Sequence, residues 1–230
     1  MNEPGGKGKT LWEMLVERVK GNNSNGHSTT VSFHNPLDLR VGAAFPMAFA
    51  NGPELEDFDF TVQEIREYVR RIAGQEFQFT DYALHGLNKK TFDADQAMTA
   101  RLRVMPNAAG GQEKALLRLY DEFAFAEDFL AVVKDESGVF EATDDDGTKA
   151  AFTRINDLRE SYEAVVLVVS ETTEDGKAAP KKTSTVKVEY WDYWREMELG
   201  AGNTTKEFIF VEMSSETGWF QIWRGREFFE

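Results

Sequence analysis

The chain has 230 residues, 41% hydrophobic and 13% aromatic, which is enough for one large β-rich domain or two small ones. Its 40 acidic and 26 basic residues give a net charge of −14, which opposes contact with phosphate backbones and anionic membranes. We therefore expect neither nucleic acid nor membrane as a partner. The absence of cysteine excludes disulfides, thiolate nucleophiles and cysteine-ligated metals. With no secretory signal and no apolar stretch of about 20 residues, this composition predicts a cytoplasmic protein.

Residues 1–30 are expected to form an amphipathic helix followed by a flexible tether. Thr10 and Glu13 have capping-box spacing, and the apolar residues of 10–20 share one helical face. Residues 21–30 are mostly Gly, Asn and Ser, with almost nothing to bury. The helix is free either to dock on the body of the protein or to bind a protein partner.

Two segments share a pattern that is typical of β-hairpins. Residues 67–81 and 192–212 both read acidic-Tyr-x-Arg-x-apolar, then a turn, then Glu-Phe-x-Phe-x-acidic. This favours strands over a helix at 58–72, where the apolar spacing alone fits either. We interpret the pattern as two related β units, residues 31–110 and 111–230, although two unrelated hairpins with common cross-strand chemistry would also explain it.

The middle of the chain adds further elements to these units. Strand patterns occur at 98–105 and 114–123, and a helix is predicted near 126–135. Residues 162–171 contain a run that is apolar on both faces, which indicates a central strand. The polar residues 172–183 are expected to form a loop.

An aromatic meander is predicted at the end of the chain. Three β-branched and aromatic runs, 183–199, 206–213 and 218–225, are separated by turn residues. Trp194 shares a strand face with valines and is expected in the core. Both faces of the first strand carry large apolar groups, so either both are covered or one is an aromatic interaction surface. The residues of that candidate surface are Trp191, Tyr193, Trp219 and Trp223.

No motif predicts catalytic, cofactor-binding or metal-binding residues. Gly6–Thr10 lacks the first glycine of a phosphate-binding loop, and Asp144–Gly147 lacks the ligand spacing of a calcium loop. The latter is better interpreted as a solvated turn. Asp81, Tyr82 and His85 lie close together, but without a nucleophile motif they are interpreted as an Asp and a His at a strand end with Tyr82 in the core.

Three short segments resemble bacterial proteins of the YjfK type, a family with a domain of unknown function. They are Asn35-Pro36-Leu37-Asp38-Leu39-Arg40-Val41-Gly42, the hairpin ending in Phe79-Thr80-Asp81-Tyr82-Ala83-Leu84, and Tyr193-Trp194-Arg195-Glu196 followed by Glu207-Phe208-Ile209. The resemblance covers residues 35–215 and implies a β-rich cytoplasmic protein. It implies no catalytic residue.

The sequence as a whole predicts a mainly β (α+β) fold of two small barrel-like or sandwich units with an N-terminal amphipathic helix. The predicted function is non-catalytic binding or scaffolding, through the helix or the aromatic meander. The alternative is a carboxylate-dependent hydrolase acting on a glycan, because two catalytic carboxylates can come from any two strands.

Overall fold

The computed structural model describes most of the chain after residue 33. The described ranges are 34–45, 55, 57–72, 75–91, 97–107, 110–144, 146–155, 162–171, 182–200 and 202–228. The side chains of residues 71, 72, 75, 162, 182 and 183 are outside this description. The predicted helix and tether at 1–30 lie outside the described residues.

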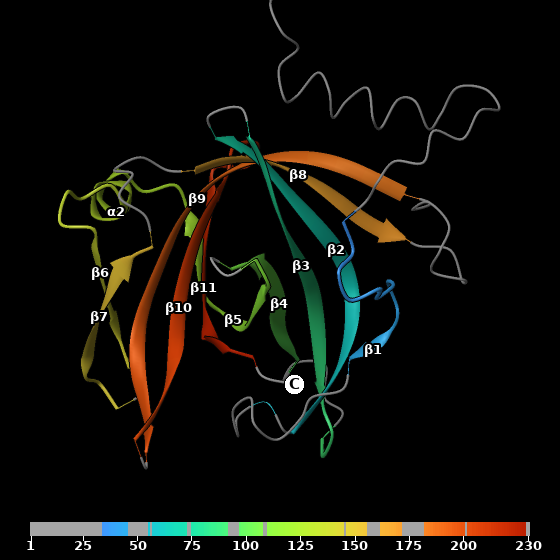
Figure 1. Ribbon diagram of the computed structural model, residues 1–230, viewed down its shortest axis with the longest axis horizontal. Helices are drawn as coiled ribbons and strands as arrows, with labels where there is room; N and C mark the ends of the chain where they lie inside the picture. The colour runs from blue at the N-terminus through green and yellow to red at the C-terminus, as the bar shows by residue number, and fades with distance from the viewer. Residues whose placement is uncertain are drawn as a thin grey trace, which may run out of the picture.

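Eight strands close into an antiparallel barrel (Figure 1). The hydrogen-bonded order around it is β2-β3-β4-β5-β11-β10-β9-β8, and β8 pairs back with β2. The barrel strands are β2 (Phe58–Ile72), β3 (Gln75–Asn88), β4 (Met98–Pro106), β5 (Gln112–Ala124), β8 (Tyr162–Glu171), β9 (Lys182–Gly200), β10 (Asn203–Ser214) and β11 (Trp219–Glu227). The fold is therefore mainly β, as the alternating sequence pattern predicted.

Residues 58–72, whose pattern fitted helix or strand, form β2. Val62 and Ile65 are three residues apart, yet both are fully buried in the same hydrophobic cluster. A register shift between Val62 and Glu64 inserts one extra residue and returns Ile65 to the face of Val62. The bulge thus produces the three-residue apolar spacing that resembles a helix.

The prediction of two β units is corrected by the closure of the sheet. Strands from 31–110 and from 111–230 pair with each other at β2–β8 and at β4–β5, so the two halves share one sheet. The two matching segments do form hairpins, β2–β3 and β9–β10. However, β2 and β9 run in the same direction while their hairpins advance around the barrel in opposite senses. No rotation about the barrel axis superposes these hairpins, and any other rotation that did so would exchange their inner and outer faces.

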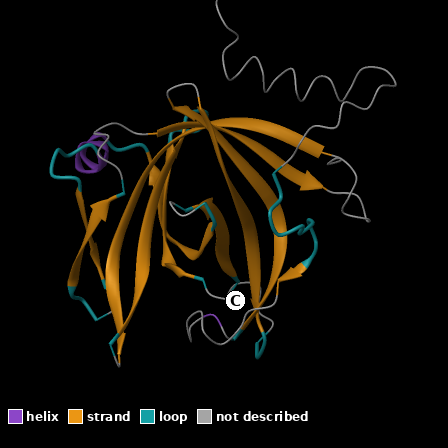
Figure 2. Ribbon diagram, in the orientation of Figure 1, coloured by secondary structure: helices purple, strands orange, loops and turns teal. Residues whose placement is uncertain are grey.

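Smaller elements cover the outside of the barrel (Figure 2). On one side, the segment after residue 34 with β1 (Ala44–Phe45) packs on an apolar cluster of β2, β3 and β4. On the other side, α2 (Glu127–Val133) and the hairpin of β6 (Val139–Thr143) and β7 (Lys149–Arg154) cover β9, β10 and β11. The helix confirms the prediction near 126–135. Over the described ranges, no helix has the length and hydropathy needed to span a bilayer.

Candidate ligand-binding site

Charged side chains fill the centre of the barrel. Strand alternation directs Ala100, Leu102 and Val104 of β4 to the outer cluster, and Arg101 and Arg103 to the lumen. Arg101 and Arg103 reach Glu212 on β10, although β5 and β11 separate the two strands in the sheet. These contacts therefore cross the lumen.

The two arginines share two carboxylates in a hydrogen-bonded network. Arg103 donates to both oxygens of Asp81 at 2.7 Å, and to Oε1 of Glu212 at 2.5 Å. Arg101 donates to Oε2 of Glu212 at 2.7 Å. The hydroxyl of Tyr68 lies 3.1 Å from both oxygens of Glu212. We name Tyr68, Asp81, Arg101, Arg103 and Glu212 the lumen network.

Aromatic rings enclose both guanidinium groups. Arg101 lies 3.7 Å from the ring centroid of Trp223. Arg103 lies between Phe79, at 4.7 Å, and Phe210, at 4.4 Å. These rings stabilise the cations and limit their rotation. The two arginines of the lumen network are therefore held in fixed positions by both hydrogen bonds and aromatic rings.

The pKa values of two carboxylates in the lumen are shifted in opposite directions. Burial raises the pKa of Glu212, but the charges of Arg101 and Arg103 outweigh burial and lower it to about 2. Burial raises the pKa of Asp192 to about 6, and the charges of Arg103, whose Nη1 lies 3.9 Å from Oδ1, and of Arg70 only partly offset burial. Glu212 is therefore always ionised near neutral pH, whereas Asp192 gains a proton in mildly acidic solution.

A cavity of about 330 Å³ opens at the mouth of the barrel beside the β10–β11 turn. We name it the mouth cavity. Its wall is aliphatic, its floor carries charged and hydrogen-bonding groups, and its rim is polar with one indole. The wall is Val166, Val168, Val186 and Val188, the floor is Glu64, Arg66, Tyr68, Glu212 and Gln221, and the rim is Ser184, Ser214, Thr217 and Trp219.

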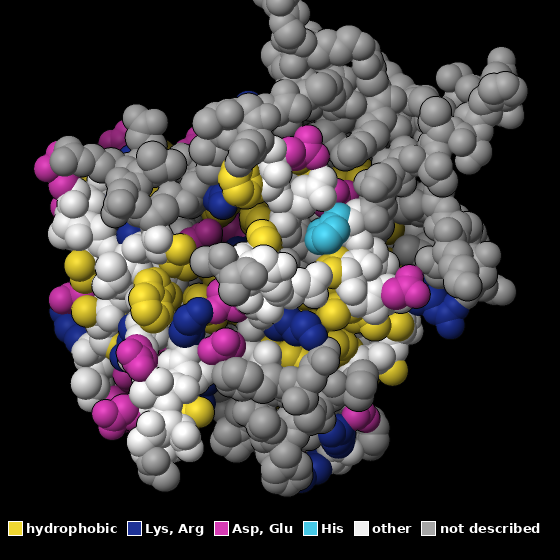
Figure 3. All heavy atoms as spheres, in the orientation of Figure 1, with side chains coloured by type: hydrophobic (Ala, Val, Ile, Leu, Met, Phe, Trp, Pro, Cys, Tyr) yellow, Lys and Arg dark blue, Asp and Glu magenta, His cyan; other side chains and the backbone are white. Residues whose placement is uncertain are grey.

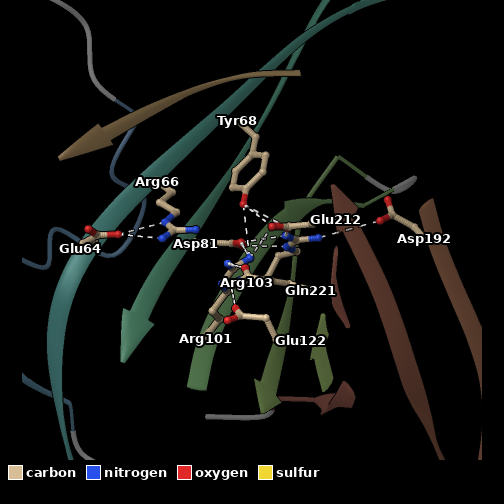
Figure 4. Close-up of polar contacts among 10 residues, drawn as sticks. All are labelled: Glu64, Arg66, Tyr68, Asp81, Arg101, Arg103, Glu122, Asp192, Glu212 and Gln221. Atoms are coloured by element: carbon tan, nitrogen blue, oxygen red, sulfur yellow. Dashed lines mark hydrogen bonds and ion pairs between the residues drawn. The ribbon is translucent and has the colours of Figure 1, made fainter. Parts of the chain in front are cut away.

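Arg66 supplies the accessible charge of the mouth cavity. Its Nε and Nη2 donate to Oε2 of Glu64 at 3.1 and 2.9 Å, and the two side chains are 29% and 34% exposed. Figure 4 shows the guanidinium reaching from Glu64 toward Tyr68 and Glu212. Burial lowers the pKa of Arg66, but Tyr68 and Glu64 outweigh burial and raise it, so the group stays charged. Gln221 links the floor to the lumen network by accepting a 2.9 Å hydrogen bond from Arg101.

The predicted aromatic surface is divided by the barrel wall. Trp191 and Tyr193 are 1% and 0% exposed beneath α2 and the β6–β7 hairpin, and Trp223 is 2% exposed inside the lumen. These three residues cannot form a surface, so the prediction is wrong for them. Trp219 is 46% exposed and stands on the rim of the mouth cavity. On the face in Figure 3, hydrophobic side chains are interspersed with charged ones.

The structure also places the other candidate site residues that the sequence suggested. Tyr82 is fully buried in the core as predicted, but Asp81 lies in the middle of β3 and belongs to the lumen network. The expected turn at Asp144–Gly147 does join β6 to β7, and Asp144 is bound by two arginines instead of being solvated. No group of potential metal ligands is found within the part of the chain that the structure describes.

The sequence interpretation missed Arg101, Arg103 and Glu212. In the segment 98–105, apolar and basic residues alternate, which is typical of a strand with one face in solvent. In 206–213 the mixed face of Phe208, Phe210 and Glu212 was the available signal, since a solvent face seldom repeats phenylalanine. Only the closure of the sheet identifies these faces as lumen.

Comparisons with protein-family models, with curated proteins and with solved structures found no match.

Proposed function

We propose that the protein is a non-catalytic, cytoplasmic binding protein that takes a small amphipathic molecule into the mouth cavity. The observation that carries the proposal is the cavity itself, in which an aliphatic wall faces a rigid polar floor. Binding sites of this kind combine mostly apolar linings with a few fixed polar groups, and they occur in the mouths of barrels. The volume of about 330 Å³ suits a small ligand.

The lumen network supports binding better than a purely structural role. Burying two ion pairs costs desolvation, and well-packed apolar residues of similar volume are often as stable or more stable. Stability alone therefore gives little reason for four charges in a barrel core. A network that ends in Tyr68, Glu212 and Gln221 on the cavity floor instead presents ordered polar groups to a ligand.

The contacts of Glu212 favour binding over glycan hydrolysis. Both of its oxygens accept hydrogen bonds from an arginine and lie within hydrogen-bond distance of Tyr68, and its pKa is about 2. A general acid must carry a proton at the working pH, and Glu212 does not. The hydrolase alternative would need another acid beside the ligand.

Anilinonaphthalene sulfonate, an amphipathic fluorescent probe, tests the proposal. We expect it to bind the wild-type protein and to lose at least tenfold in affinity in Val168→Trp, because the indole fills the cavity. Val139→Trp is the matched control, since Val139 is 39% exposed on β6 and should leave probe affinity unchanged. Equal binding by Val168→Trp and wild type, with unaltered melting temperatures, would exclude the mouth cavity as the site.

A further inference from the structure

A second cavity, of about 310 Å³, lies outside the barrel beside the β6–β7 turn. We name it the outer cavity. Four arginines and three carboxylates line it, which leaves one positive charge in a chain whose net charge is −14. The arginines are Arg118, Arg195, Arg224 and Arg226. A cationic cavity in an acidic protein indicates an anionic occupant.

One buried carboxylate orients two of these arginines. The Nε of Arg195 donates to Oε2 of Glu207 at 2.6 Å, and the Nε of Arg224 donates to Oε1 at 2.8 Å. The side chain of Glu207 is 6% exposed. The ring of Phe152, which is fully buried, lies within 5.5 Å of both guanidinium groups. Nη2 of Arg195 also lies 2.5 Å from Oε2 of Glu207, so Glu207 and Phe152 fix the positions of both guanidinium groups.

The Nη2 atom of each arginine also reaches Asp144. Nη2 of Arg195 lies 3.2 Å from Oδ2 of Asp144, and Nη2 of Arg224 donates to Oδ1. The hydrogen bond from Arg224, helped by Arg195, lowers the pKa of Asp144, so a charged carboxylate occupies the clamp. Asp144 is 27% exposed and sits on a turn, at the edge of the cavity. The carboxylate occupies the place that an external anion would take.

We infer that the outer cavity binds a phosphate monoester, whose phosphoryl group replaces Asp144 between Arg195 and Arg224. Guanidinium forks match phosphate oxygens, and a dianion gains more from two cations than a single carboxylate does. Arg226, on the same lining, adds a further cation. Leu55, Leu116 and Met197 also line the cavity and provide apolar contact for the organic part of an ester. Asp144 then acts as a tethered competitor that weakens binding until it is displaced.

Titration calorimetry with phenyl phosphate, inorganic phosphate and benzoate tests this inference at constant ionic strength. Asp144→Asn removes the competing charge, so phenyl phosphate affinity should rise at least tenfold over wild type. The matched control is Asp146→Asn, which removes an equal charge from the same cavity lining. The side chain of Asp146 accepts from the amide of Thr148, and this control should change affinity less than threefold. Inorganic phosphate should bind more weakly than phenyl phosphate in every variant.

Three results would overturn the inference. These are equal phenyl phosphate affinity in Asp144→Asn and Asp146→Asn, no binding to either, or benzoate binding as tight as phenyl phosphate. If Asp144→Asn does not fold, Arg226→Gln in the wild-type background provides a second test. This variant should weaken phenyl phosphate binding at least fivefold. Unchanged affinity in Arg226→Gln would count against the site. These outcomes are independent of the mouth cavity, which opens on the other face of the sheet.

Discussion

Substitution of Arg103 by methionine probes the lumen network most directly. Arg103 is 1% exposed and joins Asp81, through two hydrogen bonds of 2.7 Å, to Glu212 at 2.5 Å. Methionine keeps a long side chain between the surrounding rings but removes the charge. Asp81 then keeps only the 3.5 Å ion pair with Arg101, while Glu212 keeps its bonds to Arg101 and Tyr68.

The expected loss of stability is large, because one buried carboxylate loses its main partner. Breaking a buried ion pair in this way costs about 3 to 5 kcal/mol. At roughly 2 to 4 °C per kcal/mol for a domain of this size, Arg103→Met should lower the melting temperature by about 6 to 20 °C. Urea denaturation measures the free energy directly, and an unchanged slope would show that the unfolded state is unaffected.

Two further variants separate charge from packing. Arg40 is exposed, so Arg40→Met should change the free energy of unfolding by no more than about 0.5 kcal/mol. The double variant Asp81→Leu/Arg103→Met removes both charges together and should be more stable than Arg103→Met alone. If Arg103→Met stays within about 1 kcal/mol of Arg40→Met, the ion pairs of Arg103 do not stabilise the folded protein.

Three other expectations follow from single residues. Folding raises the pKa of Asp192 from 3.8 to about 6, so the free energy of unfolding falls as pH rises between those values. Asp192→Asn should therefore be more stable than wild type by about 2 to 3 kcal/mol at pH 7 and equally stable near pH 4. Urea midpoints at the two pH values measure the difference. Trp223→Ala should cost about 3 to 5 kcal/mol in thermal unfolding, whereas Trp219→Ala should cost about 0.5 kcal/mol or less, and equal losses would contradict their placement. A side chain at Gly225 would place Cβ 1.8 Å from the carbonyl oxygen of Leu116. Gly225→Ala should therefore disrupt β5–β11 pairing and reduce the yield of soluble protein. A melting curve like that of wild type would refute the close approach.

The local pattern of the sequence determined most of the strands and their turns. Alternation of apolar and polar residues, with glycine-rich and polar segments between, is a property of neighbouring residues and can be recognised without the fold. The run 162–171 was recognised as a central strand because it is apolar on both faces, and β8 is indeed buried on both faces between β2 and β9. The β2 pattern was ambiguous only because its bulge changes the spacing of Val62 and Ile65.

Tertiary structure alone decided which strand faces meet and where charge is buried. The pairings β2–β8 and β5–β11 join residues about a hundred positions apart, and no local signal encodes them. In a closed barrel with outer coverings, both faces of a strand are hidden from water, so alternation no longer distinguishes core from surface. Arg101 and Arg103 therefore resemble solvent-facing residues in sequence but lie in the lumen. Trp191 resembles a candidate contact residue but lies beneath α2 and the β6–β7 hairpin, because long-range packing determines what covers each face.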